Sequence, residues 1–194
     1  MPKPKGLFLT PGAGSSAEHP SLKAIEAAVA IPVIRHDFPY RREGRRAPDR
    51  APKAIADIAA HVPGPGWVLG GRSFGGRMCS MAVAEDAVDA AGLVLISYPL
   101  HPPGKPAQLR TEHLPSIRVP CLFISGTKDA FGTPAELEAA TATIPGPVTH
   151  VWIDGKGHDL RGADAVLAET VARWVRDLPG SAPPARGGRS RGSG

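Results

Sequence analysis

The pentapeptide Gly71-Arg72-Ser73-Phe74-Gly75 lies between an apolar run at residues 67–70 and a stretch with helical periodicity at residues 76–88. This order predicts a strand, a sharp turn and a helix that begins under the serine, which is the layout of a nucleophile elbow. The turn forces Ser73 into a strained backbone conformation, and only small neighbours tolerate the crowding. We therefore expect the Ser73 hydroxyl to stand exposed at the carboxyl edge of a sheet, near the positive end of the helix.

A second match to the same G-x-S-x-G pattern occurs at Gly188-Arg189-Ser190-Arg191-Gly192. It lies in a tail rich in glycine and serine, with no strand pattern before it and no helix pattern after it. The pattern by itself is therefore weakly specific, and its context gives the match at Ser73 its value.

Short apolar runs alternate with helical periodicity outward from the elbow. The sequence predicts strands at residues 6–10, 31–38, 67–72, 92–98, 119–125 and 148–153, and helices at residues 20–30, 51–62, 76–88, 133–143 and 164–178, with Asp49 as a candidate cap of the second helix. This alternation predicts an α/β fold, in which a six-stranded, mostly parallel sheet has helices on both faces. The short segment between the fourth and fifth strands leaves no room for a cap domain.

The domain organisation follows from composition. Residues 1–178 are expected to form one domain, and residues 179–194 to be a disordered tail of arginine, glycine, proline and serine. The net charge of the chain is +5, and the tail carries three arginines and no acidic residue. Because no aromatic platform accompanies these arginines, binding of nucleic acid is disfavoured.

The location is predicted from what the sequence lacks. No apolar run approaches the length of about 18–20 residues that spans a membrane, and no signal-peptide h-region follows the N-terminus. Cys79 and Cys121 belong to no metal-binding spacing and are expected to be buried free thiols. These features favour a cytoplasmic protein that has neither a metal nor an organic cofactor and that does not bind membranes.

Two later loops supply the partners that a serine nucleophile needs. Asp129 follows the fifth predicted strand and His158 follows the sixth, at the same sheet edge as Ser73. We assign Ser73 as nucleophile, His158 as general base and then acid, and Asp129 as the group that orients the imidazole. Asp154 and Asp159, beside His158 in the sequence, are the alternatives to Asp129. The other histidines are expected to be surface or structural residues, with His101 the exception because it follows the fourth strand.

The oxyanion hole of an acyl transfer requires two N–H donors. The first is expected from the backbone of Phe74, directly after the nucleophile, and the second from Ala13 in the loop after the first strand. A phosphate cradle is the other interpretation of this glycine-rich loop. The loop lacks the Lys-Ser/Thr ending of a P-loop and the spacing of a dinucleotide fingerprint.

Several segments together resemble one family. They are Pro11–Gly14, Asp37–Tyr40 with Arg45 and Pro48–Arg50, Gly70–Arg77, Tyr98–Gly104, Gly126–Asp129 and Gly157–Asp159. The chain resembles the small alpha/beta-hydrolase family related to dienelactone hydrolases, which includes a testis-expressed protein and the hydrolase-like region of the third subunit of the NSL chromatin complex. The resemblance covers residues 7–178 and implies an alpha/beta-hydrolase fold and the same roles for Ser73, Asp129 and His158. Pro11-Gly12 stands where such proteins often carry His-Gly, so the oxyanion loop departs here from the family pattern.

Two segments are candidates for substrate binding. Five arginines crowd residues 41–50, and we expect Arg45 and Arg46 to contact an anionic substrate or the acidic surface of a protein partner; a solvated charged loop is the alternative. The proline-rich segment after the fourth strand is expected to form a rigid wall near Ser73, with Tyr98 and His101 at the site.

The sequence thus predicts a serine hydrolase that cleaves a small-molecule ester or thioester through an acyl-enzyme intermediate. The alternative is a catalytically silent protein that keeps the fold as a scaffold and binds a protein partner.

Overall fold

The computed structural model describes residues 3–178. Six strands form one sheet in the order β2-β1-β3-β4-β5-β6, and every neighbouring pair is parallel, as predicted. The strands are β1 (Gly6–Thr10), β2 (Val33–Arg35), β3 (Trp67–Arg72), β4 (Ala90–Ile96), β5 (Cys121–Gly126) and β6 (Val148–Ile153). The central strands are apolar runs buried along their whole length, which is the pattern of a sheet covered on both faces.

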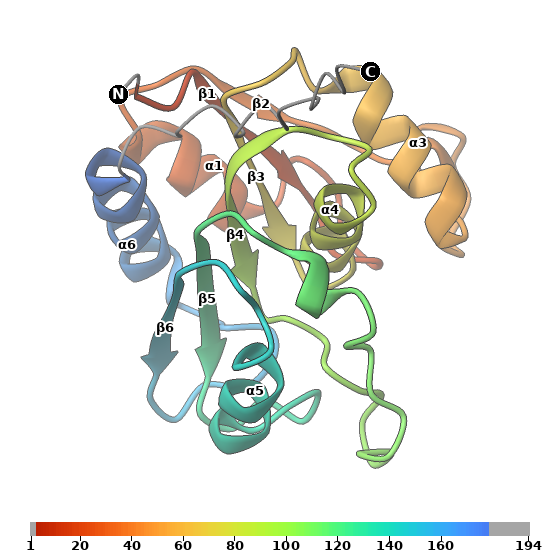
Figure 1. The fold of residues 1–194 in the computed structure, drawn as a ribbon, viewed down its shortest axis with the longest axis vertical. Coiled ribbons are helices and arrows are strands. Elements are labelled where there is room, and N and C mark those ends of the chain that lie inside the picture. The colour runs from red at the N-terminus through yellow and green to blue at the C-terminus, as the bar shows by residue number, and fades with distance from the viewer. Residues whose placement is uncertain (1–2, 179–194) are drawn as a thin grey trace, which may run out of the picture.

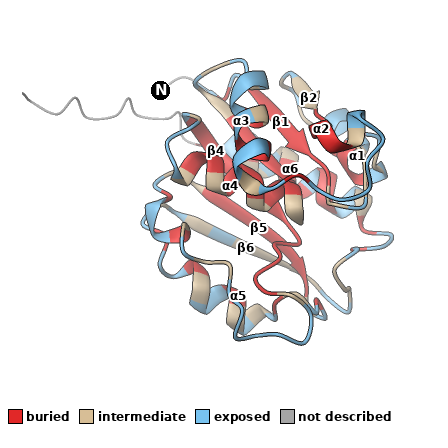
Figure 2. Ribbon diagram, turned by 90° about the vertical axis from the view of Figure 1, so that its right-hand side faces the viewer, coloured by how far each residue is buried: buried red, intermediate tan, exposed pale blue. Residues whose placement is uncertain are grey.

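Helices cover both faces of the sheet (Figure 1). They are α1 (Pro20–Ala28), α2 (Pro39–Arg42), α3 (Ala51–His61), α4 (Phe74–Ala84), α5 (Pro134–Thr141) and α6 (Asp164–Asp177), with a short 3-10 helix η1 (Leu114–Ser116). Apolar side chains of α1 and α6 pack with one face of the sheet, and those of α3, α4 and α5 pack with the other. Figure 2 shows the result, with buried strands inside and exposed outer faces on the helices.

The second strand is shorter than predicted. Residues 31–38 read as one strand, but only Val33–Arg35 pair with β1, and Phe38 at the end of the run is already the N-cap of the next helix. The chain then turns into α2, which the sequence analysis missed; Pro39 opens this helix, where its fixed φ is favourable. Asp49 is not the cap of α3, because Arg50 holds the N-cap position and the Asp49 carboxylate accepts the N–H of Tyr40 instead.

The helix ends show how local sequence sets boundaries. Thr133 caps α5, where its hydroxyl accepts the Glu136 N–H while the Glu136 carboxylate accepts the Thr133 N–H, a complete capping box. Helix α4 begins at Phe74, directly after the serine, rather than at residue 76. The turn between β3 and α4 is therefore shorter than the helical periodicity indicates.

The carboxyl edge of the sheet is left to loops. Between β4 and β5 the described chain holds only η1 and irregular segments, so no cap domain covers this edge, as predicted.

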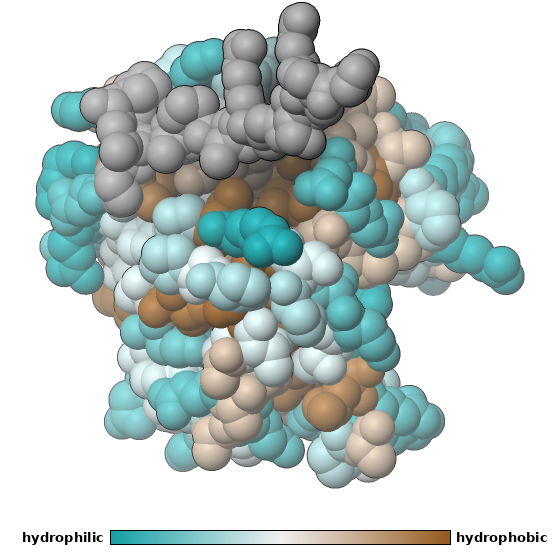
Figure 3. Space-filling model, viewed as in Figure 1, coloured by the Kyte–Doolittle hydropathy of each residue, from teal (hydrophilic) through white to brown (hydrophobic). Residues whose placement is uncertain are grey.

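The predicted disordered tail at residues 179–194 lies outside the described residues. In residues 3–178, no helix combines the length and apolar character needed to cross a bilayer. Polar and apolar residues are interspersed on the face shown in Figure 3.

Candidate active site

Ser73 occupies a strained turn at the end of β3. Its backbone has φ 46° and ψ −114°, a conformation that L residues rarely adopt and that persists only when the surroundings enforce it. The Ser73 N–H donates to the Ile96 carbonyl oxygen at 2.8 Å, which holds the turn against the end of β4. A Cβ on Gly75 would lie 2.5 Å from the Pro11 carbonyl oxygen, so only glycine fits there. The predicted elbow geometry is thus present.

Ser73, His158 and Asp129 form a hydrogen-bonded chain. His158 Nε2 lies 2.8 Å from Ser73 Oγ, and His158 Nδ1 lies 3.0 and 2.9 Å from the two Asp129 carboxylate oxygens. Asp129 is buried, whereas about a quarter of the His158 side chain is exposed, 24%. With Asp129 ionised, Nδ1 is the donor and Nε2 faces the serine hydroxyl as acceptor. This arrangement can remove the proton of Ser73.

The two alternative carboxylates have other partners. Asp154 accepts the hydroxyl of Thr127 at 3.1 Å, and Asp159 accepts the N–H of Arg161 at 3.3 Å. Both are exposed, and neither contacts the imidazole of His158. The geometry therefore favours Asp129 among the three candidates.

Neighbouring loops fix the imidazole and carboxylate. The Lys128 N–H donates to the Lys156 carbonyl oxygen at 2.9 Å, which joins the loops after β5 and β6. The Phe131 N–H donates to Asp129 Oδ1 at 2.8 Å, and the Phe131 ring stacks on His158 with 3.9 Å between ring centroids. The hydrogen bond restrains the carboxylate, and the stacking restrains the plane of the imidazole.

The loop after β1 approaches the serine from the other side. A Cβ on Gly12 would lie 3.7 Å from Ser73 Cβ, and the Tyr40 hydroxyl donates to the Ala13 carbonyl oxygen at 2.8 Å. Ala13 and Phe74 both line the cavity at Ser73. In the described part of the chain, neither backbone N–H has a hydrogen-bond acceptor, so both are available to a ligand.

A cavity of about 520 Å³ opens beside Ser73. This volume lies within the usual range of small-molecule sites, about 300–1,000 Å³. Its lining comes from the end of β3, the start of α4 and the loops that follow β1, β4, β5 and β6, so the carboxyl edge of the sheet assembles it. Phe74, Pro99 and Phe131 contribute apolar walls.

Residues 3–192 match the family described as "Alpha/beta hydrolase domain". The chain belongs to this family. The predicted relationship to a testis-expressed protein and to the third subunit of the NSL complex is narrower than this match and stays a prediction.

Three solved structures illustrate how widely the fold of this alpha/beta hydrolase domain is shared. The type II thioesterase BorB from the borrelidin biosynthetic cluster is 20% identical, with a TM-score of 0.64 and coverage of 91% of this chain and 94% of that one. Dienelactone hydrolase from Anabaena variabilis is 20% identical, with a TM-score of 0.67 and coverage of 91% and 87%. Est1E from Butyrivibrio proteoclasticus with ferulic acid bound is 15% identical, with a TM-score of 0.70 and coverage of 91% and 90%. At these identities the likeness shows the fold alone.

Tyr98 and His101 lie behind the cavity wall of the alpha/beta hydrolase domain rather than on it. Tyr98 is buried, its hydroxyl donates to the Arg110 carbonyl oxygen at 2.9 Å, and burial raises its pKa. The His101 N–H donates to the Phe131 carbonyl oxygen at 3.0 Å. Both residues support groups that line the cavity, namely Arg110 and Phe131. The predicted wall itself includes Pro99.

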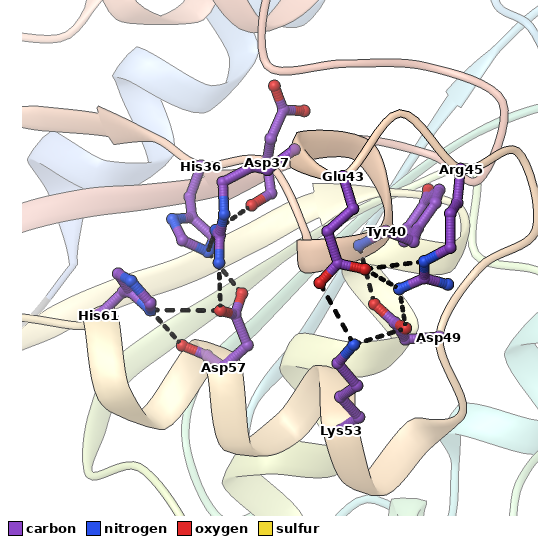
Figure 4. Close-up of polar contacts among 10 residues, drawn as sticks. His36, Asp37, Tyr40, Glu43, Arg45, Asp49, Lys53, Asp57 and His61 are labelled. Carbon is purple, nitrogen blue, oxygen red and sulfur yellow. Dashed lines mark hydrogen bonds and ion pairs between the residues drawn. The ribbon is translucent and has the colours of Figure 1, made fainter.

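Arg45 and Arg46 do not line the cavity either. Arg45 Nη2 lies 2.7 Å from an oxygen of Asp49 and 2.7 Å from an oxygen of Glu43, and Lys53 completes this network (Figure 4). Arg46 is exposed. Carboxylates of the same loop therefore neutralise part of its positive charge. Contact of Arg45 or Arg46 with a substrate stays a prediction.

One group in residues 3–178 has the side-chain composition of a metal site. Potential ligand atoms of His36, Asp57 and His61 lie within 4.8 Å of one another. Arg42 already occupies this cluster, because its guanidinium nitrogens lie 2.8 Å from Asp57 Oδ1 and 3.2 Å from His36 Nε2. The guanidinium supplies the positive charge that the buried Asp57 carboxylate requires, so the cluster is a satisfied structural network.

The two cysteines are buried free thiols, as predicted, and burial raises the pKa of each to about 12. A protonated thiol is a poor nucleophile, so neither cysteine competes with Ser73.

A group of basic residues at the cavity was not predicted from the sequence. Arg72, Arg77, Arg110 and His19 all line it. Arg72 and Arg77 flank the elbow serine, so the motif itself holds this signal. Arg110 lies far away in a long loop, and no local pattern could place it there.

Proposed function

We propose that the protein is a serine hydrolase that cleaves an ester or thioester of a small molecule through an acyl-enzyme intermediate. One observation carries this proposal: His158 Nε2 lies 2.8 Å from the hydroxyl of Ser73, whose backbone is strained, while the other imidazole nitrogen contacts buried Asp129. The proteins of similar fold named as a thioesterase and a dienelactone hydrolase support the same chemistry.

Acylation begins when Ser73 Oγ attacks the carbonyl carbon and its proton passes to His158 Nε2. The imidazolium that results is stabilised by the Asp129 carboxylate. The carbonyl oxygen becomes an oxyanion, and the N–H groups of Phe74 and Ala13 are the donors that we assign to it. As the intermediate collapses, His158 returns the proton to the leaving oxygen or sulfur.

Deacylation repeats these steps with water. His158 Nε2 takes a proton from water, whose oxygen attacks the acyl carbon, and Ser73 leaves with the proton. The loops around Ser73 leave the cavity connected to solvent, since no cap domain covers the edge in the described chain. Water therefore has access to the acyl-enzyme.

A fluorophosphonate probe tests the proposal, because it reacts with activated serine nucleophiles. We expect mass spectrometry to find the adduct on Ser73, and we expect His158→Ala to slow labelling by about 10²- to 10⁴-fold, the usual contribution of a general base. Ser190→Ala, in the second G-x-S-x-G match, is the control and leaves labelling unchanged. A folded protein that is not labelled would overturn the proposal and favour a scaffold that binds a partner.

A further inference from the structure

The cavity at Ser73 is strongly biased toward positive charge. Among residues 3–178, three arginines line it, Arg72, Arg77 and Arg110, whereas no aspartate or glutamate does. A cleft with charges of one sign and low-dielectric walls concentrates its field and raises the local concentration of oppositely charged ligands. The apolar walls formed by Phe74 and Phe131 provide such an environment.

Arg72 is engaged within the protein. Its Nη1 donates to the Ser21 hydroxyl at 3.1 Å, and its Nη2 donates to the Asp159 carbonyl oxygen at 2.7 Å. The side chain is buried, and this burial lowers its pKa. Arg72 therefore joins the elbow to α1 and to the His158 loop.

Arg77 and Arg110 are different. In the described part of the chain, neither forms an ion pair, and the buried Arg77 Nε has no hydrogen-bond acceptor. Burial lowers the pKa of Arg110, and the nearby charge of Arg77 lowers it further. Two like charges thus share one wall, and no carboxylate of residues 3–178 forms an ion pair with either of them.

The fold holds this pair in place. Arg77 lies one helical turn after the nucleophile, and its N–H donates to the Ser73 carbonyl oxygen at 3.0 Å. Arg110 is held through its backbone, because its N–H donates to the Leu100 carbonyl oxygen at 2.9 Å and its own carbonyl oxygen accepts the Tyr98 hydroxyl. Arg35, Arg42 and Arg45 pair with carboxylates. Exposed arginines such as Arg173 have water as their partner, whereas Arg77 and Arg110 are partly buried in the cavity wall.

We propose that Arg77 and Arg110 bind an anionic group of the substrate, a carboxylate or a phosphate, while the scissile carbonyl lies at Ser73. The inference rests on the proposed function and names its substrate class. Guanidinium groups suit such anions because they donate two parallel hydrogen bonds. Since Arg77 is one turn from Ser73, the anion lies only a short chain away from the carbonyl. The substrate is thus a short ester or thioester with a charged end.

Three matched 4-nitrophenyl esters test the assignment. One is the half-ester of adipic acid with a free distal carboxylate, the second is the same compound capped as a methyl ester, and the third carries a distal phosphonate. We expect kcat/KM to be about tenfold or more higher for a charged ester than for the capped one, the order expected of a charge-assisted hydrogen bond. The better of the two charged esters identifies the anion.

Variants then locate the anion subsite. Arg77→Gln and Arg110→Gln are expected to lose most of this preference, so that kcat/KM falls much further for the charged ester than for the capped one, whereas Arg110→Lys keeps part of the preference. Arg173→Gln, an exposed arginine on α6, is the control and keeps the full preference. Misfolding would lower both activities equally, so the ratio reports the subsite. A native protein without the preference, or a double variant that retains it, would overturn the inference.

A binding measurement separates this inference from the proposed function. Calorimetry on Ser73→Ala compares the monomethyl adipate anion with neutral dimethyl adipate. Tighter binding of the anion that requires Arg77 and Arg110 supports the subsite even if no ester is turned over, in which case only the proposed function fails. If the capped ester is turned over with no preference for the charged esters, the proposed function holds and the anion subsite fails. Equal binding of the two adipate compounds would also reject the subsite.

Discussion

At the scale of single residues, the environment of Asp129 decides what His158 can do. The carboxylate is buried and accepts hydrogen bonds from both the Phe131 N–H and the imidazole. An ionised carboxylate only accepts hydrogen bonds, so it fixes the proton of the neutral imidazole on Nδ1. Nε2 then keeps its lone pair for the serine proton. We therefore assign to Asp129 the role of fixing this tautomer, rather than a role in charge transfer.

Asp129→Asn tests this role. The amide can still accept the Phe131 N–H, but its NH₂ group then faces Nδ1 and favours the tautomer that is protonated on Nε2. We expect kcat for an activated ester to fall by about 10³- to 10⁴-fold, as for the corresponding change in a serine protease. Thermal unfolding monitors the fold. Asp154→Asn, an exposed residue bonded to Thr127, is the matched control and retains activity. Equal activities for the two variants would contradict the assignment.

At the scale of elements, the elbow works because glycines let α4 approach β1 and β3 closely. A Cβ on Gly75 would lie 2.5 Å from both the Pro11 carbonyl oxygen and Thr10 Oγ1, and a Cβ on Gly76 would lie 2.7 Å from the Gly71 carbonyl oxygen. These contacts join the nucleophile to the loop that carries Ala13. The glycines therefore position both the serine and an oxyanion donor.

Gly75→Ala is expected to cost about 1–3 kcal/mol of unfolding free energy, because the new methyl group meets backbone that cannot move freely. The serine would shift with it, so labelling by the fluorophosphonate should also slow. Gly14→Ala is the control, since a Cβ there meets no atom within 4 Å, and its stability should change by less than about 0.5 kcal/mol. Urea unfolding of the two variants measures the difference. Equal stabilities would mean that the elbow relaxes around the extra carbon.

At the scale of the whole molecule, the order of strands and helices could be predicted because each is a local pattern. The same order placed Ser73, Asp129 and His158 at one edge, since parallel strands end together. The path of residues 97–113 could not be predicted, because it depends on distant contacts such as the Tyr98 hydroxyl with Arg110. Arg110 could therefore not be predicted at the cavity, whereas Arg77 follows the elbow serine and could have been; charge alone pointed to Arg45 and Arg46, which do not line it.

Such distant contacts also couple global stability to pH. His113 packs between α4 and the loop after β4, and its Nε2 lies 2.8 Å from the Ser80 hydroxyl. Burial, and secondarily the charge of Arg77, lower the pKa of His113 to about 4, although Glu112 opposes this shift. Between pH 6.5 and pH 4 the unfolded chain therefore binds a proton that the folded protein does not. The contribution of neutral His113 to the free energy of unfolding is therefore fully present above pH 6.5 and is lost as the pH falls toward 4.

The loss attributable to His113 should reach about 2 kcal/mol at pH 5, since each pKa unit corresponds to about 1.4 kcal/mol. His113→Gln keeps a side chain that can bond to Ser80 but does not titrate. Urea unfolding at pH 7 and pH 5 should therefore show a smaller decline for the variant than for the native protein. Burial also lowers the pKa values of His36 and His150. Their contributions to the loss of stability are the same in both proteins and cancel in the comparison. Parallel declines would show that His113 is protonated in the folded protein at pH 5.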